Sequence, residues 1–173
     1  MPAIDLPFLS GYPEAMLAPV RAALADGRLG PWLARRYPQA HAVRSDPALY
    51  AHAMAMKQRY LRHAGPLAKV VYDGRLQLDQ RALGTLTAVS RVQGGKLAAK
   101  REIRIAAVFK DAPAAMLDMI LAHELAHLRH REHDKAFYAL CEHLQPEYHQ
   151  VEFDTRIYLT LRAADAAARA AAP

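Results

Sequence analysis

Apolar side chains recur at helical spacing near the start of the chain, three or four positions apart: Met16, Leu17, Val20 and Leu24. A longer helix is expected to begin at Asp46, which can cap its N-terminus, with Pro47 in the first turn. The glycine–proline pair at 65–66 should end this helix. These patterns predict a helical N-terminal part over residues 1–66.

The middle of the chain has the pattern of β-strands. Three segments carry this pattern: residues 68–73, 84–90 and 102–109. The first segment ends in an Asp–Gly turn signal, and the second is rich in β-branched residues. The third follows a basic loop and begins with alternating polar and apolar residues, so Ile103 and Ile105 should face the same side. We therefore predict a small sheet within residues 67–110.

The helical pattern returns after the predicted sheet. Asp111 can cap the next helix, Pro113 suits its first turn, and four residues form its apolar face: Met116, Met119, Ile120 and Leu121. Asp134 should cap a second helix in the same way. A third helix is expected over about residues 151–168.

Helices grouped around one small sheet indicate an α+β fold. A chain of 173 residues has room for one domain with a substantial core, so we expect a single domain over residues 1–173. Residues 112–168 would form its C-terminal helices, and the alanine-rich tail at 163–173 should be a fraying helix end.

The net charge of +6 is concentrated in one part of the chain, residues 81–110. This segment holds one acid, Glu102, and seven basic residues: Arg81, Arg91, Lys96, Lys100, Arg101, Arg104 and Lys110. A basic surface of this kind would attract nucleic acid, nucleotide phosphates or acidic peptides. A solvated face that aids solubility is the competing interpretation.

The strongest chemical signal is the HExxH pattern formed by His123, Glu124 and His127. Residues four apart in an α-helix lie about 40° apart around the axis and about 6 Å apart along it. His123 and His127 can therefore bind one metal ion from a single helix face. Glu124 lies beside the first histidine, where its carboxylate can act as a general base for a water molecule that zinc activates.

Two histidines compete to be the third ligand. His130 would lie about 10.5 Å along the axis from His123 if the helix continued, which is too far for one ion. His133 directly precedes the predicted N-cap Asp134, so the chain must turn just before it and can bring its side chain back to the metal. We therefore favour His133 over His130.

The candidate ligand histidines need outer partners, and imidazole ligands accept more than one metal. A ligating histidine usually donates its second ring N–H to a carboxylate or a carbonyl. Four carboxylates could serve, and the spacing selects none of them: Asp134, Glu142, Glu152 and Asp154. Zinc (Zn²⁺) is the expected metal, and Ni²⁺, Co²⁺ and Mn²⁺ also accept imidazole ligands.

Cysteine content and hydropathy point to a reducing compartment. The single cysteine, Cys141, excludes an internal disulfide and a cysteine zinc ribbon, and we expect it in the core. The first residues lack the pattern of a secretory signal, and no stretch is long and apolar enough to cross a bilayer. We therefore expect a cytoplasmic protein with no membrane association.

The chain resembles the YgjP-like metallopeptidase family, small bacterial proteins of the zincin type. The most specific segment is residues 120–138, which holds the HExxH histidines, His133 and the aromatic residue Phe137 at the family's spacing. Flanking segments also resemble the family, so the resemblance covers about residues 9–162. One departure is Asp134, where many relatives have serine, and both residues cap helices.

This resemblance implies a minimal zincin fold: a short sheet, an active-site helix and a following helix. It also implies His123, His127 and His133 as zinc ligands and Glu124 as the catalytic base. The family's peptidase label derives from the motif, and some members have been described as metal-dependent UTP pyrophosphohydrolases.

Several functions remain open. We expect first a metallopeptidase, in which the zinc-bound water attacks a peptide carbonyl of a peptide or protein. The alternative is a UTP pyrophosphohydrolase, in which Arg91, Lys96 and Lys100 would neutralise the triphosphate. A nucleic-acid-associated protease of the SprT-like kind would use the basic segment 81–110. A binding module with a structural zinc is disfavoured, because structural sites usually have four ligands.

Overall fold

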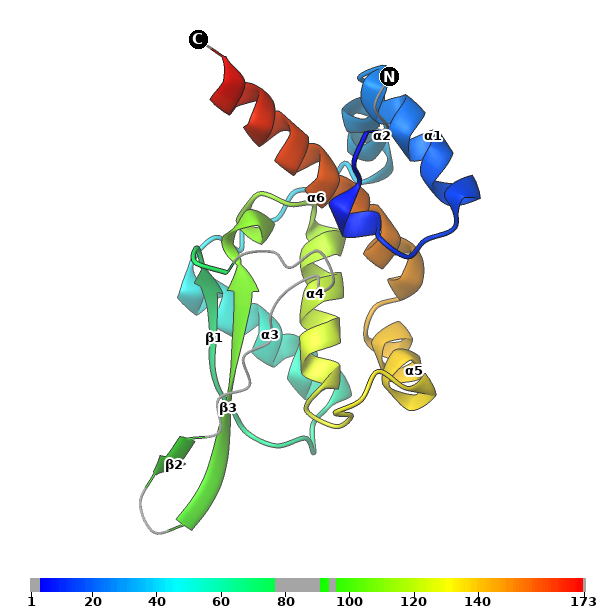
Figure 1. Ribbon diagram of the computed structural model, residues 1–173. Coiled ribbons are helices and arrows are strands. Elements are labelled where there is room, and N and C mark those ends of the chain that lie inside the picture. The colour runs from blue at the N-terminus through cyan, green and yellow to red at the C-terminus, as the bar shows by residue number, and fades with distance from the viewer. Residues whose placement is uncertain (1–3, 77–90, 94–95, 173) are drawn as a thin grey trace.

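The computed structural model describes residues 4–76, 91–93 and 96–172, with side chains omitted for 91–93 and 96–100 (Figure 1). Its elements, in chain order, are η1 (Pro7–Leu9), α1 (Glu14–Ala25), α2 (Leu29–Arg36), α3 (Asp46–Tyr60), β1 (Leu67–Asp73), β2 (Arg91–Gln93), β3 (Lys96–Ala106), η2 (Ala107–Lys110), α4 (Ala114–Ala126), α5 (Lys135–Leu144) and α6 (Tyr148–Ala171).

One small sheet in the order β1-β3-β2 organises the fold. β1 pairs in parallel with β3, which places Val70 opposite Ile103, and β2 pairs with β3 as an antiparallel hairpin. Helix α3 packs against β1, and α4 lies between the sheet and the helices α5 and α6 in Figure 1. The predicted α+β class is confirmed, with a helical N-terminal part preceding the sheet.

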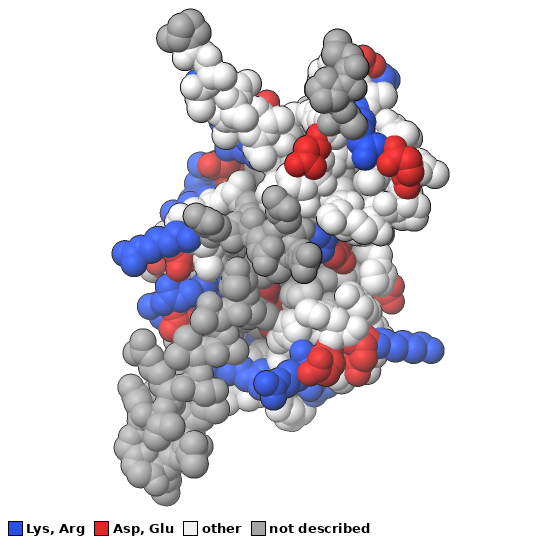
Figure 2. Space-filling model, in the orientation of Figure 1, with Lys and Arg blue, Asp and Glu red and all other residues white. Residues whose placement is uncertain are grey.

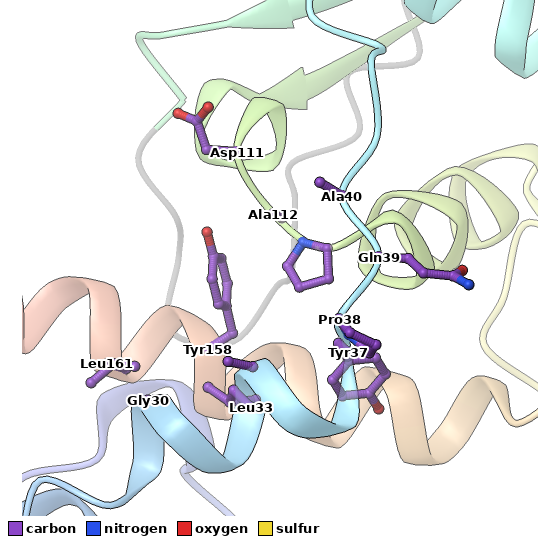
Figure 3. A pocket seen from close by; sticks show the side chains of 12 residues that line it. Gly30, Leu33, Tyr37, Pro38, Gln39, Ala40, Asp111, Ala112, Tyr158 and Leu161 are labelled. Carbon is purple, nitrogen blue, oxygen red and sulfur yellow. The ribbon is translucent and has the colours of Figure 1, made fainter.

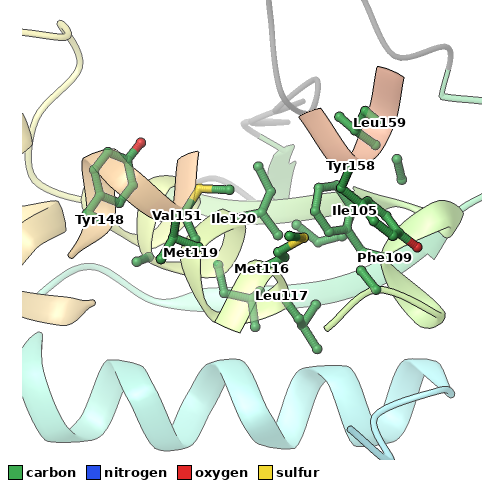
Figure 4. Packing of buried hydrophobic residues seen from close by; sticks show 14 of the residues in the cluster. Ile105, Phe109, Met116, Leu117, Met119, Ile120, Tyr148, Val151, Tyr158 and Leu159 are labelled. Atoms are coloured by element: carbon green, nitrogen blue, oxygen red, sulfur yellow. The ribbon is translucent and has the colours of Figure 1, made fainter. Parts of the chain in front are cut away.

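Helix α4 forms the centre of the core. Most of its residues are buried, on all sides of the helix rather than on one stripe. Met116, Leu117 and Ile120 pack among Ile105 and Phe109 before α4, while Val151 and Leu159 of α6 belong to the same cluster (Figure 4). A helix held from every side is a rigid support for the residues at its C-terminal end.

The N-terminal caps of two helices differ from the prediction. Ser45, not Asp46, caps α3, since its hydroxyl accepts a hydrogen bond from the N–H of Ala48. The Asp46 carboxylate instead accepts the N–H of Tyr72 on β1 at 2.9 Å and so satisfies an edge-strand donor. Asp111 does not cap α4, because its carboxylate pairs with Arg44 at 3.0 Å.

The boundaries of the strands and of the last helix also needed correction. The predicted basic loop is part of β3, which begins at Lys96, and the strand ends at Ala106, where η2 follows. Helix α6 begins at Tyr148 and includes most of the alanine-rich tail. The predicted strand at 84–90 lies outside the described residues.

A cavity of about 290 Å³ lies at the opposite end of α4 from the histidines, between α2, α6 and residues 111–113 (Figure 3). Its wall is mostly apolar, with Leu33 and Leu161 among its lining residues, and Tyr158 lies beside it. It is separate from the HExxH residues. Among the described residues, none of the helices is long and apolar enough to cross a membrane.

The contact between His52 of α3 and Asp118 of α4 predicts a measurable pH dependence. Their side chains are 2.6 Å apart, and the hydrogen bond to the carboxylate raises the pKa of His52. The folded state therefore gains stability below the ordinary histidine pKa of about 6.5 and loses it as the pH rises through the raised pKa. Both side chains are about one-third exposed, so we expect less than about 1 kcal/mol.

An NMR titration of the His52 ring checks this prediction in the parent protein and in the Asp118→Asn variant. The midpoint should fall in the variant, and the stability difference between pH 5 and pH 8 should shrink with it. An unchanged midpoint would show that Asp118 does not control His52.

Candidate metal centre

The last turn of α4 brings two histidines to one side of the helix. His123 lies within α4, and His127 is its C-cap residue with helical backbone angles. The chain makes one further turn, with the N–H of His130 donating to the carbonyl of Ala126 at 3.0 Å. The α-helix therefore ends before His130, and the chain is free to reverse direction.

The structure brings His123, His127 and His133 together, with one ring nitrogen of each within 4.8 Å of the others. The Nε2 atom of His133 is 3.1 Å from Nε2 of His127 and 3.3 Å from Nε2 of His123. Ligands bound tetrahedrally to zinc at 2.0–2.1 Å are about 3.3 Å apart. Both distances from Nε2 of His133 therefore fit ligands of one zinc-sized ion.

The second ring nitrogen of His127 indicates where its proton lies. Nδ1 of His127 is 2.9 Å from the carbonyl oxygen of His130, which can only accept a hydrogen bond. Nδ1 must therefore be the protonated nitrogen, and Nε2 directs a lone pair toward the other two histidines. This is the tautomer that a metal ligand requires.

His133 reaches the site because the chain is fixed on both sides of it. Asp134 caps α5, as predicted, by accepting the N–H of Phe137 at 2.9 Å. The buried ring of Phe137 lies against all three imidazoles, with ring centres 4.5–5.0 Å apart. His130 contributes its backbone carbonyl, and its ring is not part of the cluster.

Glu124 is a buried acid for which the described residues provide no hydrogen-bond partner. Its side chain is 2% exposed, and Oε2 makes no hydrogen bond to any described residue. Loss of solvation raises the pKa of Glu124 well above its ordinary value. A carboxylate beside His123 with an unsatisfied oxygen suits the position of a general base.

The electrostatics of His123 favour the neutral ring. Burial, with a smaller contribution from the nearby His127 and His133, lowers the pKa of His123 to about 3. Burial also lowers the pKa of His127. Metal ligands must be neutral imidazoles, so these rings are ready to bind an ion at neutral pH without losing a proton.

None of the four carboxylates predicted as outer partners contacts a histidine of the candidate site. Asp134 caps α5, and the exposed Glu142 pairs with His149 at 3.2 Å. Glu152 pairs with Arg156 at 3.0 Å, and the buried Asp154 pairs with Arg36 at 2.8 Å. Each carboxylate is thus taken up by a nearer donor. The partner of His123 is instead Tyr148, whose hydroxyl oxygen is 2.7 Å from Nδ1. No spacing rule in the sequence links Tyr148 to α4, because the fold brings them together.

Three cations of the basic segment have internal partners. Arg101 donates a hydrogen bond to the backbone carbonyl of His127, Arg104 pairs with Asp73 at 2.9 Å, and Lys110 lies over the ring of Tyr72. On the face shown in Figure 2, described basic and acidic side chains are interspersed rather than gathered by sign. The described part of the segment is therefore less available to an anion than its sequence suggested.

The other predicted phosphate contacts lie on the hairpin: Arg91, Lys96 and Lys100. The strand register pairs Arg91 with Lys100, and their side chains lie outside the described part of the structure. Cys141 is buried as predicted, and burial raises the pKa of its thiol to about 12, which argues against a nucleophilic role.

A comparison with known proteins matches the region that contains the candidate metal centre. Residues 87–154, which include the three histidines, match the family described as YgjP-like, metallopeptidase domain. The chain is also 53% identical over 156 residues to a protein of Escherichia coli (strain K12) named UTP pyrophosphatase, covering 90% of this chain and 93% of that protein. No solved structure gives a significant match. Identity at this level over nearly the whole of both sequences means that the chain belongs to the YgjP-like metallopeptidase family.

Proposed function

We propose that this protein is a metal-dependent hydrolase that converts UTP and water into UMP and pyrophosphate. The observation that carries the proposal is the convergence of three histidine Nε2 atoms at the end of α4, the helix in which Glu124 is buried with no hydrogen bond from Oε2 to a described residue. The substrate is suggested by the name of the 53% identical relative. This reverses the order expected from the sequence, in which peptide cleavage came first.

His123, His127 and His133 would hold the metal ion, with zinc as the first candidate and Ni²⁺, Co²⁺ or Mn²⁺ as alternatives. A bound divalent ion supplies Lewis acidity, which makes water more acidic and offsets the charge of the substrate. The neutral rings of His123 and His127 and the fixed tautomer of His127 suit this role, since neither ring has to lose a proton before the ion binds.

Glu124 would accept a proton from the attacking water. The water oxygen then forms a bond to the α-phosphorus of UTP, and the bond from that phosphorus to the bridging oxygen breaks, releasing pyrophosphate. Burial raises the pKa of Glu124, so its carboxylate, once ionised, is a stronger base than an exposed one, and a bound cation would favour the ionised form. Arg91, Lys96 and Lys100 remain the predicted contacts of the triphosphate.

Peptide hydrolysis is the second candidate, favoured by the metallopeptidase description of the matching family. The same histidines and Glu124 would then direct water to a peptide carbonyl carbon. Nucleic-acid binding through residues 81–110 stays a prediction, which a salt-sensitive mobility shift with single-stranded DNA would test.

UTP hydrolysis tests the proposed function directly. The zinc-loaded protein should release UMP and pyrophosphate rather than UDP and phosphate, as measured by ³¹P NMR. In ¹⁸O-labelled water the label should appear in UMP, since the α-phosphorus is attacked. Glu124→Gln should keep its zinc and lose a factor of about 10² to 10⁴ in rate, because the base is gone.

Glu142→Gln is the matched control, because Glu142 is an exposed residue that pairs with His149 on the surface. It should hydrolyse UTP like the parent. If the parent protein leaves UTP intact but cleaves a peptide library, and the Glu124→Gln variant does not cleave it, peptide hydrolysis replaces UTP hydrolysis as the function.

The choice between His130 and His133 gives a second test. His133→Ala should lose zinc on dialysis, because one of three ligands is removed. His130→Ala should keep it, because the contact from this residue is a backbone carbonyl. Metal analysis of both variants after gel filtration measures this. Zinc lost from His130→Ala and retained by His133→Ala would overturn the ligand assignment.

The buried acid also predicts a pH effect in the metal-free protein. The pKa of Glu124 is higher in the folded state than its unfolded value of about 4.3, so stability falls as the pH rises between the two pKa values. Without metal, Glu124→Gln should melt a few degrees above the parent at pH 7, and this difference should shrink toward pH 5. Equal melting temperatures of Glu124→Gln and the parent at both pH values would contradict this prediction. Glu142→Gln is the control and should melt like the parent.

A further inference from the structure

We propose that Tyr148 is a positioning residue for the metal centre, which fixes the tautomer and orientation of His123 through its hydroxyl. This inference rests on the three-histidine metal site of the proposed function and is independent of the substrate. The contact behind it is short: Oη of Tyr148 is 2.7 Å from Nδ1 of His123.

The direction of this hydrogen bond follows from the metal site. Nε2 of His123 faces the Nε2 atom of His133 at 3.3 Å and must carry a lone pair to bind an ion. Nδ1 of His123 is then the protonated nitrogen, and it donates to the hydroxyl oxygen of Tyr148. Loss of this acceptor would leave a buried N–H without a partner and release the ring to rotate.

The packing around Tyr148 suits a residue that holds another in place. Tyr148 is completely buried, and its ring lies nearly parallel to that of His123, with ring centres 6.3 Å apart and 19° between the planes. It is the first residue of α6, and Val151 on the next turn belongs to the core around α4. The hydroxyl therefore has little freedom to move away from His123.

The backbone before Tyr148 has an unusual conformation. Glu147 has a φ of 61°, and it is the single non-glycine residue with positive φ in the described part of the chain. Its carbonyl accepts the N–H of Val151 at 3.0 Å, so this left-handed residue starts α6. A conformation that is unfavourable for glutamate turns the chain sharply from α5 and sets Tyr148 facing α4.

A phenol in this position has a chemical consequence. A carboxylate partner would carry negative charge and make the imidazole a stronger donor to the ion. Among the described residues, the partners of His123 and His127 are a hydroxyl and a backbone carbonyl, both uncharged. An ion held by these histidines would therefore keep more of its positive charge, which would favour binding of an anionic substrate or of hydroxide.

Tyr148→Phe tests the role of the hydroxyl with almost no change in shape. Zinc affinity, measured by competition with a chromogenic chelator, should fall about tenfold or more. The visible spectrum of the cobalt-substituted variant should also differ from that of the parent, because His123 is no longer held in one orientation. Circular dichroism of the metal-free variant checks that it is folded.

Tyr138→Phe is the matched control, since it removes a neighbouring tyrosine hydroxyl. The ring of Tyr138 lies 6.3 Å from those of both Tyr148 and His133, and its hydroxyl makes no hydrogen bond to a described residue. Its zinc affinity and cobalt spectrum should match the parent. A purely structural role of Tyr148 would lower the melting temperature and leave both metal readouts unchanged in the folded protein.

Two substitutions of Glu147 test the backbone argument. Glu147→Gly keeps the left-handed conformation available and should retain the zinc affinity of the parent. Glu147→Val disfavours that conformation and should weaken zinc binding, as Tyr148→Phe does. Equal loss in both would point to the carboxylate of Glu147 and contradict this part of the inference.

The outcomes separate this inference from the proposed function. If the parent binds no zinc, both fail. If the parent binds zinc and Tyr148→Phe binds it within about twofold with the same cobalt spectrum, only the role of Tyr148 is overturned. If the parent cleaves peptides instead of UTP, the metal measurements still decide the role of Tyr148.

Discussion

The burial of α4 on every side is the constraint on which the rest of the structure depends. An amphipathic surface helix could place two histidines at the right spacing, but it would leave the third ligand and the base to mobile surroundings. Here the sheet, α3, α5 and α6 all belong to the same packed cluster as α4. The helix that carries His123, Glu124 and His127 is therefore also the element whose displacement would disturb the core most.

This burial explains why the site has unusual electrostatics. Glu124 and His123 lie near the end of a helix that is packed against apolar residues, so desolvation is the main cause of both pKa shifts. The shifts have opposite signs because burial disfavours the charged form of each group. In the metal-free protein the rings of His123 and His127 are therefore neutral, and the ionised form of Glu124 is disfavoured. A cation is the group that would complete this arrangement.

The parts of the site that local sequence could predict are those with a local cause. Helical spacing joins His123 to His127, and the cap at Asp134 requires the turn that brings His133 back. Tyr148 and Arg101 could not be found this way, because each contacts α4 from an element about 25 residues away in sequence. The start of β3 was missed because basic residues suggested a loop, whereas backbone pairing with β2 makes a strand there.

Arg101 links the sheet to the candidate metal centre. It belongs to β3 and donates to the carbonyl of His127, at the end of α4 where the helix has an unpaired acceptor. The same strand holds Lys96 and Lys100, two of the predicted triphosphate contacts. One continuous strand therefore carries the arginine that contacts the carbonyl of His127 and the lysines proposed to bind the substrate. β3 pairs with β1 from Arg101 onward, whereas Lys96 and Lys100 pair with β2. The register with β1 therefore holds Arg101 beside the end of α4, and the hairpin with β2 holds the two lysines on the same strand.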